Sequence, residues 1–289
     1  MERQFIKRDT KNQKLIAGGA LSPIVLDYIM DSEVPKPCRH FIGIEKDDMP
    51  KYLLFLENAF PYMDNYNYHK GMNGIIQELK GLLKTKNIGT DSDRALLLDF
   101  QATLETKPEK AIKLEKDALA QIENITADNA RLVSNLHANL GGLYRMNGHP
   151  DLAREHMEKS ISLLDQFNLL HINDSIPQIA NYAMFLTEQQ EPERGISELQ
   201  KLSGIIKEYH SDECLYYAIV HETLGTIYPM TANLSHAKTH FKKAFKIYEK
   251  IWADEPEMIE AKYQEIQELY PQVGSFLGQQ ISSSLTKQA

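Results

Sequence analysis

The chain contains few cysteines, little tryptophan and few residues that break regular structure. Its 289 residues include two cysteines, one tryptophan, 15 glycines and 12 prolines. Two cysteines, Cys38 and Cys214, cannot supply the framework of a disulfide-stapled domain, and such scarcity is typical of a reducing compartment. The low glycine and proline content excludes collagen-like and low-complexity chains.

Positive charge is also in short supply. Lysine and arginine total 32 against 40 aspartate and glutamate, so the formal net charge at pH 7 is −8. Because dedicated nucleic-acid binders usually carry a basic face, we expect no nucleic-acid partner. The 42% hydrophobic and 25% charged residues are ordinary globular proportions, enough for one long domain or two short ones.

A long uninterrupted apolar run is missing as well. The apolar stretch from Leu15 to Met30 is broken by Pro23 and Asp27, and it is shorter than the roughly 20 residues that span a bilayer. Glu2 and Asp9 interrupt the basic start that a secretory signal would need, and no small-residue cleavage site follows closely. We therefore expect a cytoplasmic protein with no membrane partner.

The sequence does contain an internal repeat of 42 residues. The pattern Leu140-Gly141-x-x-Tyr144 returns 84 residues later as Leu224-Gly225-x-x-Tyr228, and Tyr182-Ala183-x-x-Leu186 lies midway. Leu98 and Ile266 extend the anchor column by one step on either side. Such self-similarity indicates stacked copies of one supersecondary unit.

A column of prolines repeats with the same spacing. Pro108, Pro150 and Pro192 each stand at the start of a segment with helical apolar periodicity, and proline is favoured in the first turn of a helix. Each unit is therefore predicted to be two antiparallel helices. In one repeat a turn at residues 147–150 precedes a second helix from about Asp151 to Leu164.

Small residues fill two further columns of the repeat. They are Gly141, Ala183 and Gly225 in the first helices, and Ala111, Ala153, Gly195 and Ala237 in the second helices. A bulky side chain at a helix crossing holds the two axes apart. We predict that these columns lie where the helices of each hairpin cross.

The pattern resembles the tetratricopeptide repeat (TPR) family in the Leu-Gly-x-x-Tyr of the first helix and in Ala237, Phe241 and Ala244 of the second. The 42-residue spacing is similar to that of its kinesin-light-chain-like variant. The resemblance implies an all-α fold, a right-handed α-solenoid of about five antiparallel hairpins over residues 51–270. A C-terminal capping helix would run from about Pro256 to Tyr270, residues 1–50 lack the repeat, and residues 271–289 form a polar tail.

The resemblance also implies a peptide-binding groove whose inner wall is built by the first helix of each repeat. Fixed offsets from the anchor select Asn135, Asn139, Gly142, Arg145 and Met146, then Asn181, Met184 and Glu188, then Glu222, Thr226 and Met230. Asn139 and Asn181 share an offset, and stacked amides can hold an extended peptide backbone. Each could equally bond only to the neighbouring helix.

One branch of the family grips a C-terminal carboxylate with a lysine, an asparagine and an arginine. The corresponding column here reads Leu96, Ala138, Ala180 and Glu222. It contains no lysine, so we expect no clamp of that kind.

Patterns for catalysis or metal binding are sparse. The sequence has no GxxxxGK[ST], GxGxxG or GxSxG motif. His236 and His240 have the i, i+4 spacing of a metal pair but no evident third ligand, and we favour two surface histidines. Cys38 lies beside Arg39 and His40, which could activate a thiol, although an inert cysteine is favoured. We expect no enzyme, no metal and no cofactor.

Two other clusters are interpreted as structural. The lysines from Lys238 to Lys250 fall opposite Ala237 and Phe241 on a helix, which indicates a solvated face rather than a patch for an acidic partner. The aromatic residues between Phe55 and Tyr68 are interpreted as the core of the first repeat.

We therefore predict a non-enzymatic scaffold or adaptor that binds a protein or peptide segment in its groove. Asn139 and Asn181 would grip the backbone, Arg145 would supply charge, and Met146, Met184 and Met230 would make adaptable apolar contacts. The alternative is a peptide-sensing signalling regulator, whose first 50 residues are controlled by ligand bound to the repeats.

Overall fold

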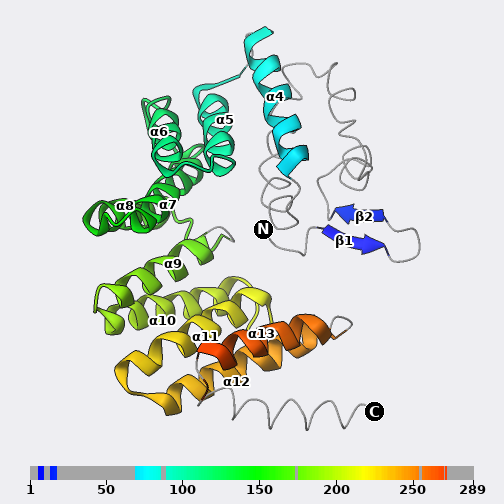
Figure 1. Cartoon of the computed structure of the whole chain (residues 1–289), viewed down its shortest axis with the longest axis vertical. Helices are drawn as coiled ribbons and strands as arrows, with labels where there is room; N and C mark the ends of the chain where they lie inside the picture. The colour runs from blue at the N-terminus through cyan, green and yellow to red at the C-terminus, as the bar shows by residue number, and fades with distance from the viewer. Residues whose placement is uncertain are drawn as a thin grey trace. The chain divides into compact units, whose positions relative to one another are not determined.

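The computed structural model describes residues 6–9, 14–17, 69–85, 89–172, 175–253, 256–269 and 271. The chain divides into two compact units, Met1–Leu163 and Leu164–Ala289. Among the described residues, strand occurs as one antiparallel hairpin, in which β1 (Ile6–Asp9) pairs with β2 (Lys14–Ala17) (Figure 1). Everything else of regular structure in the described residues is helical.

The helices of the first unit are α4 (His69–Thr85), α5 (Asp91–Thr103), α6 (Pro108–Leu119), α7 (Ala130–Met146) and most of α8 (Pro150–Gln166), whose last turn lies beyond the boundary at Leu163. Helix α5 packs on α6, α6 on α7, and the first helices α5 and α7 also contact each other (Figure 1). Ala95, Ala118 and Leu136, one from each of these three helices, form a fully buried cluster. The core of this unit therefore lies between successive hairpins.

The helices of the second unit are α9 (Ser175–Glu188), α10 (Pro192–Tyr209), α11 (Leu215–Ile227), α12 (Leu234–Ile251) and α13 (Pro256–Leu269), with a short 3₁₀ helix, η3 (Tyr228–Thr231), after α11. Each α-helix contacts the next, and α9 also contacts α11 (Figure 1). Four hairpins of the predicted all-α repeat are thus described. The first helix of a fifth hairpin, the aromatic stretch and the tail beyond residue 271 lie outside the described residues.

The proline column marks helix starts, as predicted. Pro108, Pro150 and Pro192 are the first residues of α6, α8 and α10. The next position in this column is Leu234, which begins α12 after Asn233. The Asn233 side chain accepts a hydrogen bond from the backbone N–H of His236 and so caps this helix without proline.

The small columns lie at the hairpin crossings, which confirms the prediction. A Cβ built on Gly141 would be 2.6 Å from Cγ of Met157, and one on Gly225 would be 2.8 Å from the ring of Phe241. A Cβ on Gly195 would be 2.6 Å from the carbonyl oxygen of Ala183. Real side chains do not approach so closely, so these positions set the distance between the paired helices.

The turn between the two helices of a hairpin also recurs every 42 residues. Gly148, Gln190 and Ala232 have φ values of 74°, 65° and 56°. The residue after each donates its N–H five residues back, in the bonds His149 to Tyr144, Glu191 to Leu186 and Asn233 to Tyr228. These are the bonds of a left-handed helix terminus, where glycine is the least strained residue. Only the first of the three turns uses it.

Candidate binding surfaces on the first helices

The predicted binding residues of the first unit lie on α7. Asn139 and Met146 are exposed, with 75% of Met146 accessible, whereas Asn135 and Arg145 are half-buried. A Cβ added to Gly142 would meet nothing within 4 Å, so the surface is open there as well. The offsets taken from the anchor therefore do mark the accessible side of this helix.

Asn139 is engaged with the two preceding helices. Its amide nitrogen donates to Oδ1 of Asp99 on α5 at 2.8 Å and to Oε1 of Glu115 on α6 at 3.3 Å. The structure thus realises the second alternative for this residue, a bond to neighbouring helices. A role for Asn139 in gripping a peptide backbone stays a prediction.

Glu115 is a buried acid in a column that holds Met157 and Phe241 in other repeats. Its side chain is almost fully buried, and its Oε2 has no hydrogen-bond partner. Burial, followed by the negative charge of Asp99, raises the pKa of Glu115 to about 10. The raised pKa favours the protonated form of Glu115 at neutral pH.

The predicted binding residues of the second unit lie on α9, α11 and η3. On α9, Asn181 and Glu188 are exposed and Met184 is half-buried. On α11, Thr226 is half-buried, and its hydroxyl donates to the carbonyl oxygen of Glu222 at 3.1 Å. Met230, in η3, is 58% exposed. Helix α9 packs on α11. That the predicted residues of these elements form one binding face stays a prediction.

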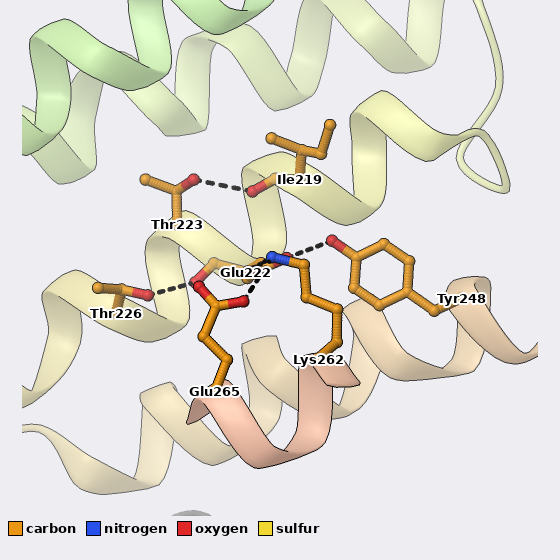
Figure 2. Close-up of polar contacts among 7 residues, drawn as sticks. All are labelled: Ile219, Glu222, Thr223, Thr226, Tyr248, Lys262 and Glu265. Carbon is orange, nitrogen blue, oxygen red and sulfur yellow. Dashed lines mark hydrogen bonds and ion pairs between the residues drawn. The ribbon is translucent and has the colours of Figure 1, made fainter. Parts of the chain in front are cut away.

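Glu222 is the centre of a polar cluster that joins three helices of the second unit (Figure 2). The hydroxyl of Tyr248, from α12, donates to Oε2 of Glu222. The ammonium of Lys262, from α13, lies 2.8 Å from Oε1 of Glu222 and 3.0 Å from Oε2 of Glu265. Both carboxylate oxygens of Glu222 thus have a donor, and its side chain is only 16% exposed.

The electrostatics of this cluster favour a cation at Lys262 and a neutral hydroxyl at Tyr248. Burial by itself lowers the pKa of Lys262, but the charges of Glu222 and Glu265 outweigh it, so the pKa is raised. Burial, and then the charge of Glu222, raises the pKa of Tyr248. The ring of Tyr248 stacks on Trp252 with centroids 4.5 Å apart, which fixes the hydroxyl in place.

Glu222 is among the residues predicted from the sequence, whereas its partners Lys262 and Tyr248 are not. A signal for Lys262 was present in the sequence, because Ile266 occupies the anchor column of Leu140 and Leu224. That placement makes α13 pack as the first helix of a further repeat, and a charge one turn before the anchor then lies near α11. Ile266 is indeed buried, with 3% exposed.

The two histidines that were considered as a metal pair, His236 and His240, each bond to a different residue. Nδ1 of His236 lies 2.7 Å from Oδ1 of Asn233, whereas Nδ1 of His240 lies 2.8 Å from Nδ1 of His221. Within the described residues, no group of three or more His, Cys, Asp or Glu side chains is arranged to hold a metal ion. Cys38 lies outside the described residues.

The basic face of α12 is solvated, as predicted. Lys242, Lys243 and Lys246 are exposed, whereas Ala237 and Phe241 on the opposite side are fully buried. None of the described helices is both long enough and apolar enough to cross a bilayer.

Comparison with solved structures identifies the fold. The chain is similar to BtubC (BKLC) from P. vanneervenii, with a TM-score of 0.54 and 16% identity over 82% of this chain and 88% of that one. It is similar to the Podosopora anserina putative kinesin light chain with nearly identical TPR-like repeats, with a TM-score of 0.53 and 13% identity over 68% and 96%. It is also similar to the apo form of RapI, with a TM-score of 0.55 and 14% identity over 86% and 72%.

At these identities the likeness establishes the fold alone, a TPR-like helical repeat. No protein-family model matches the sequence. No curated protein matches it either.

Proposed function

We propose that this chain is a non-enzymatic scaffold that binds a protein segment on the first helices of its TPR-like repeats. The proposal is supported by the separation of buried and exposed positions within the hairpins. The small columns bury the crossing between the two helices, while Asn139, Met146, Asn181 and Met230 stay exposed at the predicted offsets. Stacked hairpins pre-form such a surface, so little ordering is needed when a partner binds.

In each unit, the chemistry of the first helices favours a partner segment that carries apolar and basic side chains. Asp99 supplies negative charge beside Asn139 in the first unit. In the second unit Glu222 is the acidic residue, and Lys262 pairs with it. Met146 and Met230 occupy equivalent positions 84 residues apart and are both exposed. Methionine is a flexible side chain that adapts to varied apolar partners.

A cytoplasmic location, inferred from the scarcity of cysteine, remains part of this proposal.

The test is a pull-down from lysate of the native host, read by mass spectrometry. The wild-type chain is compared with Met146→Glu/Met230→Glu, which changes two exposed residues of the predicted surface. The matched control is Lys242→Glu/Lys246→Glu, which changes two exposed residues on α12. We expect a partner that is retained by the wild type and the control and lost by the methionine variant. A partner retained equally by all three chains would contradict binding at the first helices.

A peptide-sensing regulator is the second candidate. Its support is the match to RapI, described in its apo form, which covers 86% of this chain and so extends further than the match to the kinesin light chain. In this reading, a peptide bound to the repeats changes residues 1–50. Limited proteolysis within those residues, with and without the captured peptide, separates the two functions, since a plain scaffold predicts no change.

A further inference from the structure

Helix α13 buries fewer of its described side chains than the helix before it. Among its described side chains Ile266 is the one that is buried. The preceding helix, by comparison, buries six residues, namely Ala237, Phe241, Ala244, Phe245, Ile247 and Tyr248. An end helix with so little buried apolar surface opens more readily than the hairpins on which it rests.

Besides the buried side chain of Ile266, α13 contributes the ammonium of Lys262, which pairs with Glu222. Without it, Glu222 would keep the neutral hydroxyl of Tyr248 as its donor, although the carboxylate is largely buried. A carboxylate in such surroundings requires a cation to offset its lost hydration. The remaining parts of the site are fixed independently of α13, because Tyr248 stacks on Trp252. Thr226 in turn bonds within α11 (Figure 2).

The geometry of the site selects lysine over arginine. Oε2 of Glu222 is taken by the Tyr248 hydroxyl, which leaves Oε1 for the cation. A guanidinium binds a carboxylate best through both oxygens at once, whereas an ammonium is a point charge that needs one. The site also lies on the face of α11 that carries Thr226, among the predicted binding residues.

We propose that α13 is a displaceable end helix, and that the Glu222–Tyr248 site takes a lysine side chain of a bound protein segment in place of Lys262. This inference rests on the proposed function, since it specifies the chemistry of the partner and names the intramolecular segment that competes with it. The chain regulates its own surface in this way, because a partner must displace α13 before it reaches Glu222.

The experiment uses full-length chains and a fluorescent peptide with the sequence of residues 256–269. One full-length variant, called the undocked chain, carries Lys262→Gln and Ile266→Asp. These two substitutions remove both anchors of α13. We expect the peptide to bind this chain at least about tenfold more tightly than the wild type, by fluorescence anisotropy, because its own α13 no longer competes. A peptide carrying Lys262→Gln should lose about tenfold or more in affinity, and one carrying Lys262→Arg should be intermediate.

Two controls make the result decisive. Adding Glu222→Gln to the undocked chain should abolish the preference for the lysine peptide. Circular dichroism must show the same cooperative melt of the hairpins in both undocked chains. In the unmodified protein, an excess of the wild-type peptide, synthesised with ¹³C and ¹⁵N so that its fragments differ in mass, should accelerate hydrogen exchange in residues 256–269 of the chain. This readout does not depend on any variant.

Equal binding of the lysine and glutamine peptides would overturn the proposal, as would unchanged hydrogen exchange in α13 at saturating peptide. The outcome is separate from that of the pull-down. Peptide displacement without any captured partner would leave the site standing and remove the proposed scaffold function. A partner lost on methionine substitution, together with a failed peptide experiment, would keep the function and remove this site.

Discussion

Nδ1 of His137 lies 2.8 Å from Nδ1 of His156 across the α7–α8 hairpin, and His221 and His240 repeat this contact at 2.8 Å across α11–α12. In each pair one nitrogen donates and the other accepts, so at most one of the facing nitrogens carries a proton. The second histidine of each pair also stacks on a tyrosine, His156 on Tyr144 and His240 on Tyr228. The same histidine–histidine contact thus occurs in two repeats, in addition to the apolar core.

The histidine pairs should make the fold sensitive to acid. The pKa of each of these buried histidines lies below the ordinary value of 6.5, first because of burial and then because of nearby positive charges. The pKa is lowered to about 4 for His137, to about 3 for His221 and to about 4 for His240. Between pH 6.5 and 4 the unfolded chain therefore binds more protons, so the free energy of unfolding falls as the pH falls.

Urea denaturation at pH 7 and pH 4.5 checks this. Replacing one pair by His221→Phe/His240→Phe should reduce the acid-induced loss by roughly 1–2 kcal/mol relative to the wild type. The comparison between the two chains isolates the pair from other groups that titrate in this range. An identical loss in both chains would show that the pair is charged, or exposed, in the folded protein.

Glu115 should produce a pH dependence of the opposite sign. Its folded-state pKa is raised to about 10 from 4.5, first by burial. The stability it contributes is therefore complete below pH 4.5 and is lost as the pH rises toward 10, because only the unfolded chain gives up the proton. Glu115→Gln keeps a neutral donor beside Asp99 and should stabilise the protein at pH 8 by roughly 1–3 kcal/mol. Glu115→Gln should gain little at pH 5, and an equal gain at both pH values would argue against a protonated Glu115.

The turns at Gln190 and Ala232 should tolerate glycine better than their own residues. Both have positive φ, as Gly148 does at the equivalent position. Gln190→Gly and Ala232→Gly should each stabilise the fold by about 0.5 kcal/mol, since relief of strain exceeds the added freedom of the unfolded chain. Gly148→Ala should cost about 1 kcal/mol, measured as a shift in the denaturation midpoint. Destabilisation by both glycine substitutions would show that these turns adopt another conformation in solution.

The hairpin crossing at Gly225 should not accept a methyl group. Its added Cβ would lie 2.8 Å from the Phe241 ring, whereas a Cβ on Gly204, inside α10, would meet nothing within 4 Å. Gly225→Ala should therefore cost roughly 1–3 kcal/mol by overpacking. Gly204→Ala should stabilise by up to about 1 kcal/mol through helix propensity. Thermal melts of the two variants measure both effects. Adding Phe241→Leu should restore part of the stability lost in Gly225→Ala.

Much of the architecture follows from the 42-residue spacing alone. Pro108, Pro150 and Pro192 predicted three helix starts correctly, because the preference of proline for the first helical turn is a local effect. Gly141 and Gly225 predicted the hairpin crossings, since close approach of two helices demands a small side chain whatever the neighbours are. The exposed positions of Asn139 and Met146 were predicted from the resemblance to the TPR family, whose groove offsets were counted from the repeat anchor.

The tertiary structure decided which polar groups meet. Asn139 bonds Asp99, 40 residues away, and Lys262 bonds Glu222 at the same separation. The repeat spacing predicts that such residues lie on adjacent helices. It does not predict their rotamers, their protonation states or which side chain reaches which partner. The positive φ of Gln190 and Ala232 was likewise invisible in the sequence, because neither residue type favours that conformation. Those choices depend on packing between repeats, which is a property of the folded chain.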